Sequence, residues 1–400
     1  MEWMKLQKIA LTCALLPCFL ANAGQEYYEA RSDAMGGAGV AASNKEGAAF
    51  VNPALLAINA HKDNSAVLLI PVLGVDMADS DDMIDKFDSL IDSYDALTAA
   101  IDAENSANIT KFRDDLVGDL ESLKGTSAYA SAGLGFSVAI PHQRMPMAIF
   151  YKSYVNAVGV ADIAQSDIDT LNNLDPENPP KISDLDSQGQ VVGGAVSDLG
   201  VALSFPLSIV NMPISVGISP KLQRIDTYNY IANANNFDAS DFDDVKYRND
   251  ETNFNLDIGV AMQPFDGLTL GLSGRNLINH DVDTIEVEGQ KFTYRVEPLV
   301  TAGVAFDWNI VSVTTDIDLI ENKKFKELDG TQYWRLGGEV RAFDWMALRL
   351  GYRHDMKDST ANLYSLGTGF AFGDSFFLDF TGMFGDDNAV GGVLQTSYHF

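Results

Sequence analysis

The stretch TSAYASAGLGFSVAIP, residues 126–141, alternates between two kinds of side chain. Its even positions from 128 to 140 are apolar, as at Leu134 and Phe136, while most intervening positions carry serine or glycine, as at Ser131 and Gly133. Successive side chains of a β-strand point to opposite faces, so this period of two predicts a strand with one apolar and one small or polar face. Such a strand suits a wall that separates lipid from an enclosed lumen.

The same alternation returns along the rest of the chain. We predict about fourteen strands, near residues 65–75, 126–140, 147–163, 191–206, 213–228, 252–263, 268–279, 289–307, 310–320, 331–343, 345–356, 362–373, 375–385 and 389–400. Single-chain outer-membrane barrels of bacteria contain an even number of antiparallel strands. The last predicted strand places Tyr398 and Phe400 on one face. This ending resembles the carboxy-terminal signal that outer-membrane barrels present to the barrel assembly machinery.

The connections between the predicted strands alternate in length. The links after every second strand are tight, such as PFDG and DWN, whereas most of the others are long and polar. Outer-membrane barrels have short periplasmic turns and longer extracellular loops, so the pattern predicts an all-β transmembrane antiparallel barrel. After the amino terminus no stretch approaches 18 consecutive apolar residues, which excludes a spanning helix. A soluble sandwich also alternates, but faces this aromatic would expose too much apolar area to water.

Residues 32–58, SDAMGGAGVAASNKEGAAFVNPALLAI, are too rich in glycine and alanine to build a core of their own. We interpret residues 24–61 as a compact segment packed inside the barrel, which we call the hatch. Glycine tolerates close backbone approach, and an Asn-Pro pair marks a turn before a short apolar run. The predicted hatch and gate residues are Gly36, Gly37, Gly39, Asn52, Pro53 and Ala54.

The first 23 residues fit a secretory signal peptide. Lys5 and Lys8 precede a short apolar run, and Ala21-Asn22-Ala23 offers a cleavage site near Ala23. Both cysteines, Cys13 and Cys18, lie within this segment, so disulfides, zinc thiolates and thiol nucleophiles are excluded from the mature chain. The formal net charge of -29 argues against a nucleic-acid partner.

Residues 76–124 form an acidic insertion whose apolar residues recur at helical spacing, as at Phe87, Leu90 and Tyr94. We expect a pair of amphipathic helices on the extracellular side, the second near residues 109–123. One interpretation is a loop folded onto the mouth of the barrel. The other is a cap that binds a partner, and the sequence leaves both open.

Four stretches carry a resemblance to a known family, and they lie around Asn52-Pro53-Ala54 and beyond: ARSDAMGGAGVA, AAFVNPALLA, LGLSGRNLIN and ALRLGYRHD. With the fourteen-strand pattern, they make the chain similar to the FadL-type outer-membrane transporters of fatty acids and other hydrophobic compounds. Within that superfamily it resembles the branch named conjugal transfer protein TraF, as distinct from the thioredoxin-like TraF. The resemblance implies a barrel with an internal hatch. The acidic insertion has no counterpart that we can place in the fatty-acid transporters.

Charged residues alternate with apolar ones in the predicted strands 331–343 and 345–356. If the even positions face lipid, five side chains point into the lumen: Arg335, Glu339, Arg341, Arg349 and Arg353. The turn between the two strands sets Glu339 opposite Arg349, and Arg335 opposite Arg353, so the facing arginines call for an anion between them. Two interpretations remain open. One is a salt-bridge network with Asp257, Asp316 and Asp318, and the other is a basic stripe that holds the hatch or an anionic solute.

The sequence offers no catalytic pattern. The five histidines are scattered, and neither G-x-S-x-G nor H-E-x-x-H occurs. Pairs of acidic residues lie in predicted loops without the spacing of an EF-hand calcium site. We therefore predict no enzyme, no metal and no cofactor.

Two functions fit these observations. The first is a FadL-like channel or transporter in the outer membrane of a Gram-negative cell, in which the hatch gates passive uptake of a small or hydrophobic solute. The second is a surface or assembly protein associated with conjugal transfer, in which the barrel displays the acidic insertion and transports nothing. The expected partners are outer-membrane lipid, the assembly machinery and a hydrophobic or anionic solute.

Overall fold

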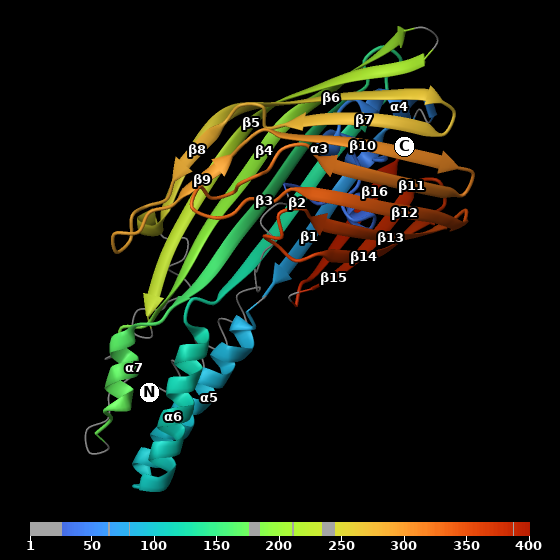
Figure 1. Ribbon diagram of the computed structural model, residues 1–400. Helices are drawn as coiled ribbons and strands as arrows, with labels where there is room; N and C mark the ends of the chain where they lie inside the picture. Colours follow the sequence, from blue (N-terminus) through green and yellow to red (C-terminus); the bar gives the residue numbers. More distant parts are fainter. Residues whose placement is uncertain are drawn as a thin grey trace.

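Fourteen antiparallel strands close into a barrel in the computed structural model of this chain (Figure 1). The structure describes residues 26–62, 65–79, 81–175, 185–209, 212–233, 245–386 and 388–400. The expected signal peptide, residues 1–23, with its cleavage site near Ala23, and the first hatch residue Gly24 lie outside these ranges. The predicted all-β barrel of fourteen strands is confirmed.

Neighbouring barrel strands follow one another along the chain, and the first pairs with the last. They are β1 (Val67–Ala78), β2 (Ser127–Ile140), β3 (Met147–Asp162), β4 (Gln188–Ile209), β5 (Met212–Asn233), β6 (Arg248–Phe265), β7 (Leu268–Arg275), β10 (Leu299–Trp308), β11 (Val311–Asp318), β12 (Tyr333–Phe343), β13 (Met346–Asp355), β14 (Leu363–Phe372), β15 (Phe376–Gly385) and β16 (Val390–His399). Tight turns join β2 to β3, β4 to β5, β6 to β7, β10 to β11, β12 to β13 and β14 to β15. We call this rim the tight-turn end and the opposite rim the long-loop end.

Two predicted strands are clearly shorter in the structure than the sequence suggests. The strand expected at 289–307 is divided, because Pro298 has no backbone N–H to donate to the ladder. Residues before it form β9 (Thr293–Val296), which pairs with β8 (His280–Asp283) in a separate hairpin, and only β10 joins the barrel. The strand expected at 268–279 ends at Arg275, because Asn276 adopts a left-handed backbone conformation with φ of 50°.

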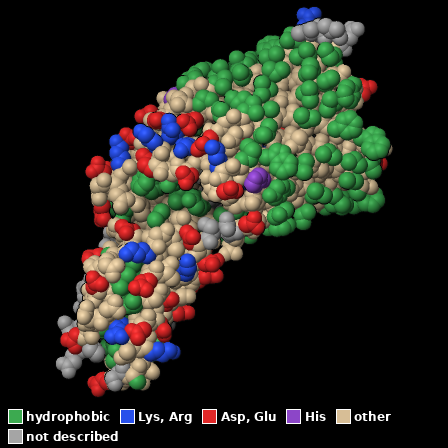
Figure 2. All heavy atoms as spheres, viewed as in Figure 1, with side chains coloured by type: hydrophobic (Ala, Val, Ile, Leu, Met, Phe, Trp, Pro, Cys, Tyr) green, Lys and Arg blue, Asp and Glu red, His purple; other side chains and the backbone are tan. Residues whose placement is uncertain are grey.

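The outer face of the barrel is apolar and the inner face is polar. In β13, Leu348 and Leu350 are exposed outward, while Arg349 and Arg353 are buried on the inner side. Hydrophobic side chains cover the visible barrel wall, whereas charged ones gather toward the long-loop end (Figure 2). Exposed aromatic side chains lie beside the tight turns, among them Trp308, Phe343, Trp345, Phe372 and Phe376. This arrangement matches an apolar band edged by an aromatic girdle.

The lumen contains three short helices from the amino-terminal segment: α2 (Ala30–Asp33), α3 (Lys45–Val51) and α4 (Leu55–Lys62). The Glu29 side chain caps α2, and the Asn44 side chain caps α3 by accepting a bond from the backbone N–H of Gly47. The principal apolar core lies between this segment and the wall, since hatch and strand residues share one buried cluster. In that cluster the rings of Phe50 and Phe150 meet edge to face, with centroids 6.1 Å apart.

The acidic insertion forms α5 (Met83–Asp102) and α6 (Ser106–Leu123), which project from the long-loop end beside α7 (Gln165–Asn172) (Figure 1). These helices share a buried apolar cluster of their own, which includes Leu116, Leu120 and Leu171. Asp76, the expected first residue of the insertion, instead lies in β1 with its side chain buried in the lumen. Among the residues that the structure describes, no helix combines the length and apolar character needed to cross a membrane.

The β8–β9 hairpin lies against the inner side of the long strands at the long-loop end. Buried residues of the hairpin and of the β11–β12 loop, Val282, Tyr294, Val296 and Phe325, form one apolar cluster with Tyr154, Val192, Val196 and Ile225 of β3, β4 and β5. We refer to this hairpin and residues 322–328 together as the loop cap. The hatch and the loop cap therefore occupy the same lumen from opposite ends.

Candidate functional site

The hatch and the wall fit together at positions where the wall carries glycine. A Cβ atom on Gly351 would lie 2.0 Å from the backbone nitrogen of Gly36, and one on Gly259 would lie 1.9 Å from Oδ1 of Asn52. Further wall glycines that a side chain would drive into the hatch are Gly74, Gly217, Gly271, Gly337 and Gly367. These distances are far below a van der Waals contact, so the hatch lies directly against strand backbone.

The predicted hatch and gate residues lie at this contact. Gly36 and Gly37 have φ angles of 72° and 84°, which favour glycine. The backbone N–H of Gly39 donates to Oδ2 of Asp316 at 2.8 Å, so a wall carboxylate holds the glycine-rich turn. The other turn of the hatch, at Asn52-Pro53, is held by the side chain of Asn52 and by residues of the wall.

Asn52, Pro53 and Ala54 form the second contact of the hatch with the wall. Nδ2 of Asn52 donates to the carbonyl of Val40 at 2.8 Å, which ties the two halves of the hatch together. The carbonyl of Ala54 accepts bonds from the hydroxyls of Ser204 and Ser215 on β4 and β5. The ring of Pro53 lies 2.8 Å from the position that a Cβ on Gly217 would take.

The charged residues expected in the lumen form ion pairs with wall and hatch residues. Glu339 lies opposite Arg349 and Arg335 opposite Arg353, as the turn predicted. Glu339 pairs with Arg349 of β13 and with Arg31 of the hatch, each at 2.8 Å. The hatch is thus fixed electrostatically to β12.

No anion is needed between the facing arginines. Arg335 makes two bonds with Asp318, at 2.8 and 3.0 Å, and Arg353 lies 3.6 Å from Asp76 of β1. The sequence predicted Asp318 as a member of a lumenal salt-bridge network, whereas it assigned Asp76 to the acidic insertion. Arg341 lies 3.5 Å from Glu339 and is exposed near the tight-turn end.

The first described residues of the hatch form an arm, Glu26, Tyr27 and Tyr28, that the sequence did not single out. Glu26 is buried, with its carboxylate 2.9 Å from Nζ of Lys324 and 3.8 Å from Nε of Arg275. Burial alone would raise the pKa of Glu26, but attraction by Lys324 and Arg275 outweighs it and holds this pKa well below the usual range. Glu26 is therefore a buried anion. A lone glutamate in a sequence carries no sign of a partner about 300 residues away.

Tyr28 lies on the inner side of the wall between β1 and β2. Its ring occupies the space that side chains on Gly74 and Gly133 would need, since Cβ atoms there would lie 2.1 and 2.7 Å from the ring. Its hydroxyl donates to Oδ1 of Asp76 at 2.7 Å and is bonded to Ser131. The tyrosine ring therefore closes the wall from within, where two neighbouring strands have no side chains.

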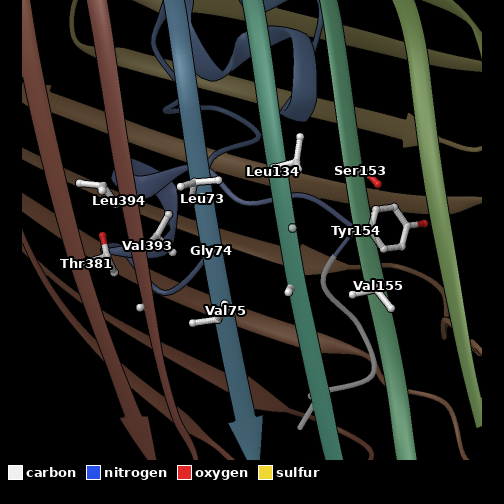
Figure 3. A pocket seen from close by; sticks show the side chains of 13 residues that line it. Leu73, Gly74, Val75, Leu134, Ser153, Tyr154, Val155, Thr381, Val393 and Leu394 are labelled. Atoms are coloured by element: carbon white, nitrogen blue, oxygen red, sulfur yellow. The ribbon is translucent and has the colours of Figure 1, made fainter. Parts of the chain in front are cut away.

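A depression of about 720 Å³ lies on the wall (Figure 3), and its lining includes Gly74 and Gly133, the two glycines against which Tyr28 packs. It is lined by residues of β15, β16, β1, β2 and β3, including the exposed Leu73, Val75, Leu134 and Leu394. Just before it, β1 slips in register against both neighbours between Leu69 and Val72. The skipped residues include Pro71, which has no backbone N–H to donate. The ladder is therefore interrupted beside the depression, at residues 70–71, whereas Leu73 and Gly74 within it pair with both neighbouring strands.

The carboxy-terminal aromatics lie on the outer face. Tyr398 and Phe400 are exposed, and their ring centroids are 6.0 Å apart. Phe400 exchanges backbone hydrogen bonds with Ala66, next to the first strand. Both residues are therefore placed at the seam between β16 and β1.

Residues 49–318 match the family described as F plasmid transfer operon, TraF, protein. The chain belongs to this family. The match begins in the hatch and ends with β11, so it includes more than half of the chain. No curated protein matches the sequence of this TraF-family chain.

Solved structures with this fold come from the FadL group. A Pseudomonas aeruginosa FadL homologue has a TM-score of 0.51 and 11% identity, covering 96% of this TraF-family chain and 99% of its own. The Ralstonia pickettii toluene transporter TbuX has a TM-score of 0.53 and 9% identity, with coverage of 94% and 97%. The Pseudomonas putida toluene transporter TodX has a TM-score of 0.51 and 11% identity, with the same coverage. At such identities the likeness shows the fold.

Proposed function

We propose that this protein is an outer-membrane channel of the FadL type, through which a small hydrophobic solute moves passively, and that the hatch gates it. One observation carries the proposal: the lumen is filled by a separate segment. An eight-stranded barrel is just filled by its own side chains, whereas barrels of 16 to 18 strands leave an aqueous channel. A barrel of fourteen strands is wide enough to need the hatch, and the hatch packs against the wall through non-covalent contacts.

The character of the wall depression supports a hydrophobic solute. Its outward lining is aliphatic, and the one large hatch side chain behind it is an aromatic ring. Two of the proteins that share the fold are named as toluene transporters. We propose the depression as the place where the solute crosses the wall, when Tyr28 moves aside and the strands beside Pro71 part.

Proposed orientation and partners follow from the barrel itself. The tight turns face the periplasm and the helices α5, α6 and α7 project to the cell exterior, because outer-membrane barrels place short turns inside. The apolar outer face meets outer-membrane lipid. The assembly machinery engages the carboxy-terminal strand, which ends with Tyr398 and Phe400 on the outer face.

Two substitutions at Tyr28 test the gate. Tyr28→Ala removes the ring behind Gly74 and Gly133, so cells that carry it should take up a labelled monoaromatic hydrocarbon faster than wild-type cells. Tyr28→Phe keeps the ring and loses only the bonds to Asp76 and Ser131, so uptake should stay near the wild-type rate. Equal uptake by wild-type cells, cells with Tyr28→Ala and cells without the protein would exclude the proposal.

A hatch deletion tests the lumen independently of the solute. Protein that lacks the hatch, residues 24–61, should conduct ions across a planar bilayer, whereas the full-length protein should stay closed. Silence of both proteins, when both migrate as folded barrels in electrophoresis, contradicts a channel.

A second candidate function, a surface role in conjugal transfer, is favoured by the family match and by the projecting helices. It predicts that replacing residues 82–124 with a short linker lowers mating frequency and leaves hydrocarbon uptake unchanged. The channel proposal predicts that the Tyr28→Ala variant changes uptake while mating stays at the wild-type frequency.

A further inference from the structure

The loop cap is anchored inside the barrel by an aromatic ring. A Cβ on Gly194 of β4 would lie 2.1 Å from the ring of Tyr294, so this ring lies directly against strand backbone. The Tyr294 hydroxyl accepts a bond from Nδ2 of Asn156 at 3.3 Å, and its ring meets Phe325 edge to face at 5.1 Å. The β11–β12 loop is thus packed onto the hairpin through Phe325.

Lys324 connects this cap to the hatch. Its backbone carbonyl accepts a bond from the N–H of Arg295 in β9 at 2.8 Å, so its main chain belongs to the cap. Its side chain is buried and extends to Glu26, with 2.9 Å between Nζ and Oε1. Lys324 is therefore bonded both to the loop cap at the long-loop end and to the hatch, which enters the barrel from the tight-turn end.

The contact leads directly to the proposed gate. Glu26 and Tyr28 belong to the same three-residue arm, and between them the ring of Tyr27 lies under Arg275, 4.8 Å from its guanidinium. If Lys324 withdraws, Glu26 keeps Arg275 at 3.8 Å and amide donors such as Nδ2 of Asn276 at 3.2 Å. Removing one partner of a buried ion pair is strongly destabilising, so the arm loses its closest cation and its ion pair with the loop cap.

We propose that the Lys324–Glu26 ion pair couples the loop cap to the hatch, so that displacement of the cap at the long-loop end loosens the arm that holds Tyr28 against the wall. This regulation rests on the channel function proposed above. A solute that enters between Phe325 and Tyr294 would displace the loop cap and thereby release Tyr28, the proposed gate. Coupling between two sites is reciprocal, so loosening the hatch also loosens the cap.

Thiol labelling tests the coupling without any transport. The predicted mature chain has no cysteine, so single thiols can be introduced by Ala38→Cys in the hatch and by Val282→Cys in the cap, both at fully buried positions. The measured quantity is the rate of reaction with a water-soluble maleimide in folded protein. Lys324→Gln should raise the rate at the hatch thiol about fivefold or more, and Glu26→Gln should do the same at the cap thiol.

The double variant and two further substitutions decide the outcome. In the double variant with Glu26→Gln and Lys324→Gln, each thiol should react no faster than in either single variant, because both substitutions remove the same ion pair. Lys323→Gln is the matched control, since it removes a neighbouring cation that is partly exposed and paired with Glu321 at 3.5 Å, and it should leave both rates unchanged. Phe325→Ala loosens the cap while it keeps the ion-pair charges, and it should also raise labelling of the hatch thiol.

Two results would overturn the coupling. One is additive effects in the double variant. The other is faster labelling of the cap thiol by Phe325→Ala or Lys324→Gln with no change at the hatch thiol. If the labelling rates at the two thiols are coupled but the wild-type protein transports no hydrocarbon, the proposed channel function is wrong and the proposed coupling stands.

Discussion

Single residues decide how closely the hatch approaches the barrel wall. The hatch backbone at Met35 and Gly36 touches the wall at Gly337 and Gly351, where neither strand carries a side chain. A side chain on either strand would have to displace backbone on both sides of the contact. The fit is therefore set by glycines of the wall that lie against the hatch backbone, although the two are distant in the chain.

A methyl group at this contact should separate hatch and wall. Gly351→Ala places a Cβ 2.0 Å from the nitrogen of Gly36, and we expect it to lower the free energy of unfolding by about 1–3 kcal/mol, the usual cost of overpacking. Gly382→Ala is the control, because nothing lies within 4 Å of its Cβ position. Urea unfolding of both variants in lipid vesicles measures the difference, and equal stability would contradict the close fit.

The contribution of Glu26 should depend on pH in a defined direction. Its pKa is lower in the folded protein than the value of about 4.3 expected in the unfolded chain. A lowered pKa gives stability that is fully present above the unfolded value and is lost as the pH falls below it toward the folded value. The stability difference between wild type and Glu26→Gln should be constant from about pH 8 to 5 and shrink below about pH 4.

The sequence predicted individual residues of the hatch but not the residues of the wall and the loop cap that they contact. Gly36, Gly37, Asn52 and Pro53 stand out because glycine and Asn-Pro pairs mark special backbone conformations. Their contacts, and the pairing of Glu26 with Lys324, depend on which strands face each other across the lumen. Local sequence carries no information about that.

Whole elements build separate apolar cores. One lies between the hatch and the strands, one lies among α5, α6 and α7 outside the barrel, and one lies between the loop cap and the long strands. The alternation and the helical spacing predicted both kinds of element. Two strands were predicted too long, at Pro298 and Asn276, where one residue ends the ladder within a run that still looks like a strand.

The separate cores imply that the projecting helices are dispensable for the barrel. Replacing residues 82–124 with a short glycine-serine linker should leave the barrel folded, with loss of order limited to α7, which packs on α6. Electrophoretic mobility before and after heating checks the barrel. Failure of this variant to form the folded band would mean that the helices support the strands.

At the scale of the whole molecule, the barrel is taller on one side than on the other. The strands β4 and β5 have 22 residues each, whereas β7 and β11 have 8. The long strands carry the loop cap on their inner side, and α5, α6 and α7 project beyond the same rim (Figure 1). The apolar band around the shorter part fixes where lipid meets the protein (Figure 2).

A charge in this band should destabilise the folded protein strongly. Leu350 lies on the outer face of β13 and is 64% exposed in the absence of lipid. We expect Leu350→Arg to cost about 2–4 kcal/mol in lipid vesicles, as arginine does near the bilayer midplane. Ile84→Arg, on the exposed part of α5, should change stability by no more than about 0.5 kcal/mol. Similar effects of the two substitutions in urea unfolding would place Leu350 outside the lipid.

The seam between β1 and β16 constrains the order of assembly. The hatch immediately precedes β1, and the finished ring of strands surrounds it on all sides. If the barrel closed without the hatch, the three hatch helices would later have to pass between the side chains that line the lumen. We therefore expect the strands to enclose the hatch while the barrel forms, before β1 pairs with β16.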